Sequence, residues 1–197
     1  SKTYDGVNGV AVIERTTFMG ETIRVKYTAS SAAAGEYVYS SEPAEGCYTV
    51  AFSNGTGVTS NYVFTEEGAG TFTIQKAILT VAYPGETITC SDRPVLRITV
   101  EGFVNGENED VAKGYRSPSV RYDGQGFGTY VLTPAGGTAD NYSFVYESGV
   151  LRVDHDLRHV GSSEVTKAVE HYECKGCHRC FLDEAATAVY EFSGDDV

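Results

Sequence analysis

Three cysteines near the C-terminus are the residues whose types and spacing could do chemistry. Cys174, Cys177 and Cys180 stand at C-x2-C-x2-C spacing. The four histidines of the chain lie in the same region, at positions 155, 159, 171 and 178. Two cysteines separated by two residues can bind one tetrahedral ion, which a histidine or a further cysteine completes. The spacing therefore predicts a zinc site, with these candidate ligands: Cys174, Cys177, Cys180, His171 and His178.

Two other chemistries fit the same cysteines. In an oxidising compartment they could form a disulfide, which would staple a segment too small to have a core of its own. The run from Cys174 to His178 also fits the C-x-x-C-H pattern of haem attachment. Haem is the least favoured of the three, because the match covers five residues and leaves the thiol of Cys180 unused. Zinc and a disulfide both stay open.

An internal repeat precedes this segment. Gly46-Cys47-Tyr48-Thr49-Val50 and the pair Asn61-Tyr62 recur about eighty residues later as Gly128-Thr129-Tyr130-Val131-Leu132 and Asn141-Tyr142. Repetition at this length indicates two similar modules in series. Cys47 falls in the first module and Cys90 in the second, so we expect free thiols there and no bridge between them.

Alternating apolar and polar residues predict short strands throughout both repeats. Leu79, Val81 and Tyr83 share one face of a predicted strand, and Leu96, Ile98 and Val100 share a face of another. Gly-rich turns separate these strands, and no βαβ alternation appears. The sequence therefore predicts a mostly β protein of two tandem Ig-like antiparallel β-sandwich domains.

We place the domains at residues 1–76 and 77–153, followed by a small acidic Cys/His-containing segment at 154–197. The junction Gln75-Lys76-Ala77 has neither glycine nor proline, so we expect a stiff joint there. The Asn-Tyr pairs at 61–62 and 141–142 are interpreted as structural: the asparagine takes a left-handed turn conformation and the tyrosine begins a strand.

Charge and motif content exclude several classes of function. The chain has 15 Lys+Arg against 27 Asp+Glu, a formal net charge of −12, and no basic stripe. We therefore expect no nucleic-acid partner and no membrane contact within this segment. No serine-hydrolase, zincin or phosphate-loop motif is present, and every histidine lies outside the two repeats. We expect no enzymatic activity.

Residues 77–153 resemble MBG-type modules of bacterial surface proteins. The resemblance is carried by Leu79-Thr80-Val81, by Gly102-Phe103-Val104-Asn105-Gly106-Glu107 and by the stretch from Gly137 to Phe144. One departure is Cys90-Ser91-Asp92, where the pattern usually has Tyr-Gly-Asp.

The flanking segments resemble two other elements of such proteins. Residues 2–76 are similar to the companion YDG-type module, through Lys2-Thr3-Tyr4-Asp5-Gly6 and Asn61-Tyr62. Residues 171–187 are similar to a short cysteine-pair hairpin of Firmicutes surface proteins, with Cys180 at a position where lysine is common.

These resemblances imply an extracellular or cell-surface segment of a larger bacterial protein, with a stalk or adhesin role. Its partners would be other domains of the parent protein and a host or cell-surface protein or glycan. The alternatives are a carbohydrate- or protein-binding module with a defined site, or a zinc- or thiol-dependent role of the C-terminal segment.

Overall fold

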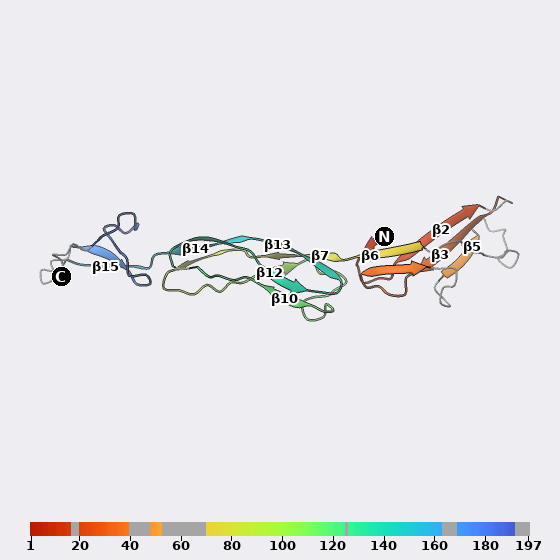
Figure 1. The fold of residues 1–197 in the computed structure, drawn as a ribbon, viewed down its shortest axis with the longest axis horizontal. Helices are drawn as coiled ribbons and strands as arrows, with labels where there is room; N and C mark the ends of the chain where they lie inside the picture. Colours follow the sequence, from red (N-terminus) through yellow and green to blue (C-terminus); the bar gives the residue numbers. More distant parts are fainter. Residues whose placement is uncertain (17–19, 40–47, 53–69, 125, 163–168, 192–197) are drawn as a thin grey trace. The chain divides into compact units, whose positions relative to one another are not determined.

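The computed structural model describes residues 1–16, 20–39, 48–52, 70–124, 126–162 and 169–191 (Figure 1). These ranges contain strands and turns but no α-helix, which confirms the prediction of a mostly β chain. Within them, no helix is long and apolar enough to cross a membrane. Cys47 and the pair Asn61-Tyr62 lie outside the described residues. The predicted domain boundaries after residues 76 and 153 stay predictions.

The chain divides into two compact units. Unit 1 comprises Ser1–Leu79, Glu101–Ser117 and Gly137–Val145, and unit 2 comprises Thr80–Val100, Pro118–Gly136 and Tyr146–Val197. Unit 1 holds β1 (Lys2–Thr3), β2 (Val10–Thr16), β3 (Thr22–Thr28), β4 (Gly35–Tyr39), β5 (Tyr48–Phe52) and β6 (Gly70–Gln75). Unit 2 holds β8 (Glu86–Thr89), β11 (Gly128–Leu132), β14 (Gly149–Asp154), β15 (Leu157–Val160), β16 (His171–Cys174) and β17 (Cys180–Phe181). Five strands have residues in both: β7 (Ala77–Ala82), β9 (Thr99–Glu101), β10 (Arg116–Ser119), β12 (Ala135–Thr138) and β13 (Tyr142–Glu147).

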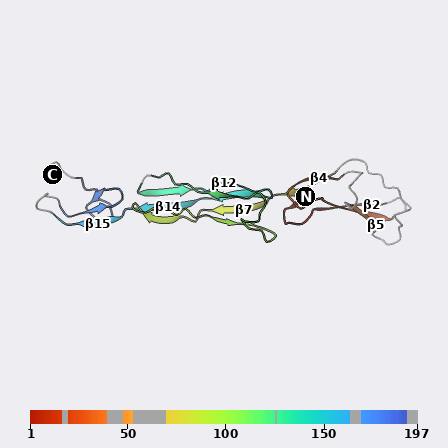
Figure 2. The same ribbon diagram turned by 90° about the horizontal axis from the view of Figure 1, so that it is seen from below.

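Unit 1 contains two three-stranded sheets, ordered β2-β3-β5 and β1-β6-β4. The first is antiparallel throughout, with β3 in the middle; Figure 2 shows β2 and β5 close together at the red and orange end of the chain. In the second sheet β4 pairs antiparallel with β6, whereas β1 pairs parallel with it, Lys2 lying opposite Ile74. Phe72 and Ile74 of β6 are buried, as expected for alternate residues on the core side of a strand.

The Asn141-Tyr142 pair has the structural role that the sequence predicts. Tyr142 begins β13 and is 2% exposed, and Asn141 is 6% exposed. The Asn141 side chain accepts a hydrogen bond from the backbone N–H of Ala34 at 2.9 Å, and its backbone carbonyl accepts one from Ala77. The predicted left-handed conformation of Asn141 is wrong, because its φ is not positive.

In unit 2, β14 is the middle strand of the sheet β11-β14-β8. It pairs antiparallel with β11 and parallel with β8. A core packs against this sheet, made of Tyr83, Val120, Leu132, Leu151 and Val153. Unit 2 also contains the small sheet β15-β16-β17. Its strands β16 and β17 flank the turn that carries Cys174 and Cys177. The two parallel pairs, β1–β6 and β8–β14, were not predicted; in both, long stretches of chain connect the partners, so no crossover helix is needed.

Candidate metal centre

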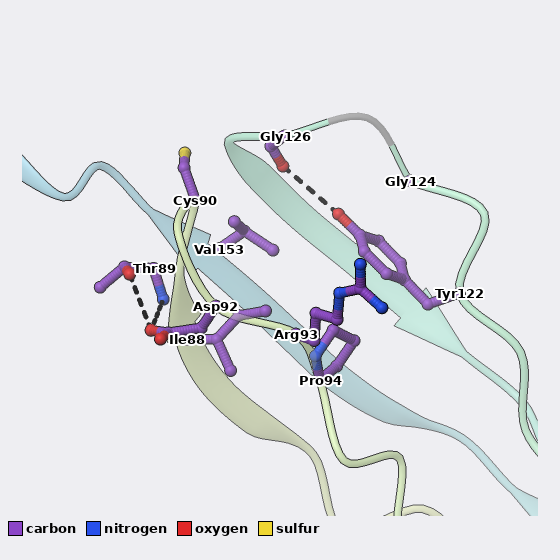
Figure 3. A pocket seen from close by; sticks show the side chains of 10 residues that line it. All are labelled: Ile88, Thr89, Cys90, Asp92, Arg93, Pro94, Tyr122, Gly124, Gly126 and Val153. Carbon is purple, nitrogen blue, oxygen red and sulfur yellow. Dashed lines mark hydrogen bonds between the residues drawn. The ribbon is translucent and has the colours of Figure 1, made fainter. Parts of the chain in front are cut away.

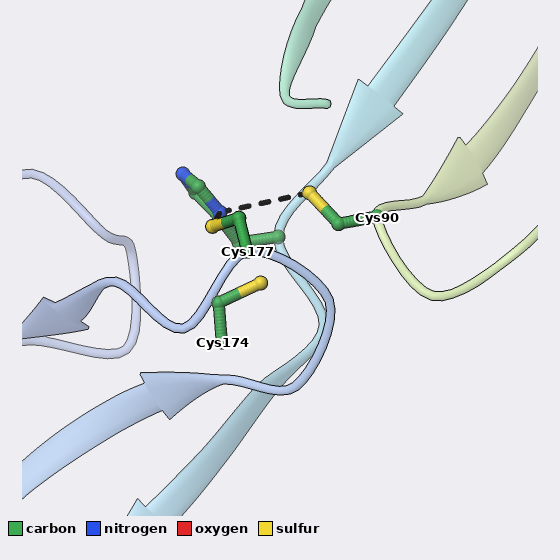
Figure 4. A group of neighbouring side chains, drawn as sticks. Cys90, Cys174 and Cys177 are labelled. Atoms are coloured by element: carbon green, nitrogen blue, oxygen red, sulfur yellow. Dashed lines mark hydrogen bonds between the residues drawn. The ribbon is translucent and has the colours of Figure 1, made fainter. Parts of the chain in front are cut away.

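Four side chains of unit 2 converge with their donor atoms facing one another. The thiols of Cys90, Cys174 and Cys177 and the ring of His155 offer ligand atoms that all lie within 4.8 Å of one another. Figure 4 shows the three cysteines gathered between the end of β8 and the turn that follows β16. Cysteine thiolates and imidazole are the donors that structural zinc sites use.

The parallel pairing of β8 and β14 places two of these donors side by side. Thr89, the last residue of β8, is opposite Asp154, the last residue of β14. Because parallel strands run in the same direction, the residues that follow them, Cys90 and His155, emerge at the same edge of the sheet. The backbone N–H of Cys90 donates to the Asp154 carbonyl at 2.8 Å, which continues the ladder by one more bond.

The antiparallel pairing of β15 and β16 brings in the other two donors. Cys174, the last residue of β16, is opposite Leu157, only two residues after His155. Beyond Cys174 the chain turns tightly, with the His178 N–H donating to the Cys174 carbonyl at 2.8 Å. A further bond, from the Lys175 N–H to the Asp156 carbonyl at 2.9 Å, ties this turn to the segment that carries His155.

The nitrogen–sulfur distances within the cluster match those of a tetrahedral site. His155 Nδ1 lies 3.4 Å from the Cys177 sulfur and 3.8 Å from the Cys90 sulfur. A zinc ion with Zn–S of about 2.3 Å, Zn–N of about 2.0–2.1 Å and tetrahedral angles separates sulfur and nitrogen by about 3.6 Å. The two observed separations lie on either side of this value, so an ion fits with small side-chain rotations.

Two aromatic rings fix the imidazole of His155. The ring of Phe127 stacks on it, with centroids 4.2 Å apart and an interplanar angle of 7°. Phe181 of β17 lies on it at 4.7 Å and 51°. Contact with two rings restricts the imidazole to few orientations, and the observed one directs Nδ1 to the thiols of Cys90 and Cys177.

The backbone of the turn favours a thiolate at Cys174. Burial alone would raise the pKa of this thiol, but hydrogen bonds from the backbone N–H groups of Cys177, Gly176 and Asp156 and from the His155 side chain lower it to about 6. A thiolate, not a thiol, is the metal-binding form of cysteine. These hydrogen bonds therefore favour the form of Cys174 that binds a cation.

Cys90 has the opposite tendency. Burial raises the pKa of its thiol to about 12, and the neighbouring sulfurs of Cys174 and Cys177 add to the effect. A second and third negative charge in one small space are unfavourable without a cation. A bound divalent ion would remove this penalty, because it supplies the largest local charge and deprotonates coordinating thiols.

The remaining predicted ligands lie outside the cluster. Cys180 is buried in β17, where burial raises the pKa of its thiol and the Glu173 carboxylate adds to the rise. His171 is 5% exposed and its Nδ1 lies 2.8 Å from the Val169 carbonyl. His178 is exposed, and its Nδ1 lies 3.4 Å from Glu173. Of the five predicted residues, the structure brings together Cys174 and Cys177.

The other two members of the cluster, Cys90 and His155, were missed by sequence reasoning. Cys90 was expected to be a free thiol, and it is one, but its sulfur lies within the cluster and not apart from it. A signal was present: Cys90 begins the stretch Cys90-Ser91-Asp92, the one departure noted from the MBG pattern. His155 directly follows the last strand of the second repeat, and only the parallel register shows that the two positions meet.

The four cysteines within the described ranges are free thiols. Haem attachment, the least favoured of the three alternatives, would use His178 as an axial ligand, but this side chain pairs with Glu173. The backbone of His178 shapes the loop. Its φ of 59° lies in the left-handed region, which reverses the chain after Cys177.

A shallow pocket adjoins the cluster on the side of Cys90. It measures about 290 Å³ and is lined by residues that include Cys90, Arg93 and Tyr122 (Figure 3). Its carboxylate, Asp92, accepts hydrogen bonds from the backbone N–H and the hydroxyl of Thr89, at 3.1 and 2.7 Å. The Asp92 carboxylate therefore holds the turn after β8, and this use lowers its pKa.

Comparison with known proteins identifies the class of one part of the chain. Residues 79–152 match the family model of the MBG domain (YGX type), which confirms the resemblance found for the second repeat. No curated protein and no solved structure matches the chain. The YDG-type module and the cysteine-pair hairpin stay predictions.

Proposed function

We propose that this chain is a non-enzymatic spacer segment of a bacterial surface protein, which holds neighbouring domains apart and offers an interaction surface. The MBG domain at residues 79–152 supports this proposal most directly, because such domains are modules of larger surface proteins. The same match supports an extracellular location.

A short, hydrogen-bonded joint between β6 and β7 supports a spacer role. A single residue, Lys76, separates β6 from β7. The Lys76 ammonium donates to the Ala139 carbonyl at 3.0 Å, and the next residue, Ala77, donates its N–H to Asn141. A flexible linker would instead need several residues without such bonds.

Side chains reinforce this joint within unit 1. The hydroxyls of Tyr4 and Tyr142 donate to the two oxygens of Glu107, each at 2.7 Å. The two rings also meet edge to face, with centroids 5.6 Å apart. Glu107 thus connects the start of the first repeat to the middle of the second, and hydrogen bonds to a charged acceptor are stronger than neutral ones.

Small-angle X-ray scattering of the 197-residue chain tests the spacer role. A compact globule of this length has a radius of gyration of about 16 Å. We expect a clearly larger radius and a profile that a rigid body fits. Insertion of Gly-Gly-Ser after Lys76 should make the profile that of a flexible chain, whereas the same insertion after Gly161, which follows β15 and has no atom within 4 Å of its Cβ position, provides a control.

Two results would contradict the proposal. One is a radius close to that of a compact globule, and the other is a flexible profile for the unmodified chain. A glycan array tests the alternative function. A reproducible, saturable hit would favour a carbohydrate-binding module over a spacer.

A further inference from the structure

We propose that Cys90, His155, Cys174 and Cys177 bind one Zn²⁺ ion in a closed tetrahedral site, which fastens the C-terminal hairpin to the edge of the β8–β14 sheet. This proposal concerns a metal site and is independent of the spacer role. It also differs from a zinc site built within residues 171–180, because two of its ligands come from positions 90 and 155.

The geometry favours a metal over a disulfide. A disulfide would use two of the three thiols and leave the third beside the imidazole without a role. In the structure His155 Nδ1 instead lies near two sulfurs, 3.4 Å from that of Cys177 and 3.8 Å from that of Cys90. An imidazole beside three thiols is the arrangement that a zinc ion with three cysteine ligands and one histidine ligand requires.

The donor set selects zinc and a structural role. Three thiolates and one imidazole are soft and borderline donors, which suit zinc in tetrahedral geometry and exclude magnesium and calcium. All four positions of the tetrahedron are filled by the protein, so no place is left for a reactive water. Sites of this kind contribute folding free energy and not catalysis.

The C-terminal hairpin has little else to stabilise it. Its sheet, β15-β16-β17, has strands of 4, 4 and 2 residues. Its buried apolar side chains among the described residues are Cys174, Cys180 and Phe181. A core of this size rarely suffices alone, and small domains commonly add a structural metal. Two of the ligands lie on this hairpin, so the ion would supply the missing stability.

Gly176 allows the turn that carries Cys174 and Cys177 to lie close to Cys90 at the end of β8. A Cβ atom at this position would lie 2.5 Å from the backbone carbonyl carbon and oxygen of Cys90. The glycine between the two cysteines therefore lets the turn approach the β8 end closely enough for Cys90 to join Cys174 and Cys177. Any larger residue would push Cys90 away from the other three donors.

Metal analysis of the full chain, purified without added zinc, tests the site. We expect one zinc per chain and protection of three thiols from alkylation, lost when a chelator is added. Cobalt replacement should give thiolate-to-cobalt charge-transfer bands and the ligand-field bands of a tetrahedral ion. Metal-free protein whose thiols stay reactive after zinc is added would overturn the proposal, as would a disulfide between any two of the three cysteines.

Single substitutions separate this ligand set from one confined to the hairpin. Cys90→Ser and His155→Ala should each weaken zinc binding by at least about 100-fold, more than the loss of an outer-shell partner. Cys180→Ser and His178→Ala should leave stoichiometry and affinity unchanged.

The reverse pattern would overturn the proposal, because it would place the ion on Cys180. Should Cys90→Ser fail to fold, the cobalt spectrum of His155→Cys decides. A four-thiolate site with stronger charge-transfer bands supports the assignment, and an unaltered spectrum refutes it.

Discussion

Removing the hydroxyl of Tyr142 should destabilise the protein far more than a typical Tyr→Phe change. The side chain is 2% exposed, and its hydroxyl donates to Glu107 at 2.7 Å while accepting the N–H of Val104 at 3.2 Å. Burial, and then the bond to Glu107, raises the pKa of Tyr142 to about 12. The hydroxyl is therefore strongly held in its neutral, donating form.

The magnitude follows from the charge of the acceptor. A hydrogen bond to a charged group contributes about 1.5–3 kcal/mol, against about 0.5–1.5 kcal/mol for a neutral pair. Tyr142→Phe also leaves the Val104 N–H without this acceptor, so we expect a loss near 3 kcal/mol. Tyr130→Phe is the matched control: its hydroxyl donates to the neutral carbonyl of Gly126 at 3.0 Å, and about 1 kcal/mol should be lost.

Urea denaturation of both variants measures these free energies of unfolding. A double-mutant cycle with Glu107→Gln isolates the pair, and we expect a coupling energy of at least about 1 kcal/mol. The reasoning is refuted if Tyr142→Phe costs no more than Tyr130→Phe, or if the coupling energy is near zero.

Three further outcomes are expected from the packing of unit 2. Gly149→Ala should lower the free energy of unfolding by at least about 3 kcal/mol, because the new Cβ would lie 1.9 Å from the Tyr83 carbonyl oxygen. Gly161→Ala, where no atom lies within 4 Å of the Cβ position, should leave the stability unchanged in the same thermal melt. Leu151→Ala, at a side chain with 0% exposure, should cost about 2–5 kcal/mol by denaturation; Val131→Ala, at 71% exposure, should change stability by less than about 0.5 kcal/mol. Burial, and then the Glu86 hydrogen bond, raises the pKa of Tyr83 to about 12. Since the unfolded chain loses this proton near pH 10, stability should fall between pH 10 and pH 12 by about 1.4 kcal/mol per unit for this group. The alkaline slope should be shallower in Tyr83→Phe, and an unchanged slope would contradict this assignment.

Strand faces were predictable wherever one side of a strand is buried. Leu79, Val81 and Tyr83 are 0%, 0% and 3% exposed, whereas Ile78, which precedes Leu79 and lies on the opposite face of the strand, is 59% exposed. The two-residue period of a strand determines this pattern from the sequence alone. The prediction for β7 is confirmed because no long-range contact was needed to make it.

The predicted strand through Leu96, Ile98 and Val100 is correct only in its second half. Leu96 has a φ of 55°, and β9 begins at Thr99. The reason is a distant side chain: the Glu86 carboxylate accepts the backbone N–H groups of Val95 and Leu96, at 3.2 and 3.0 Å. Alternation alone cannot reveal that a carboxylate occupies these donors and prevents ladder formation.

The candidate metal centre shows the same division between local and distant information. The C-x-x-C spacing identifies Cys174 and Cys177, because both lie on one tight turn. Cys90 and His155 join them through the register of β8 with β14, whose partners are more than sixty residues apart. Cys180, at equally suggestive spacing, is directed into the small sheet at β17. Spacing in sequence predicts ligands only where the chain between them is short.

The parallel pairs have a consequence for a protein under tension. In β1–β6, as in β8–β14, an early strand lies beside a late strand that runs in the same direction. A force that draws the two ends of such a pair apart acts along the strands, so it loads all of their hydrogen bonds together. Two antiparallel strands pulled from adjacent ends would instead unzip one bond at a time. Each parallel pair should therefore resist a stretching force better than an antiparallel pair pulled from adjacent ends.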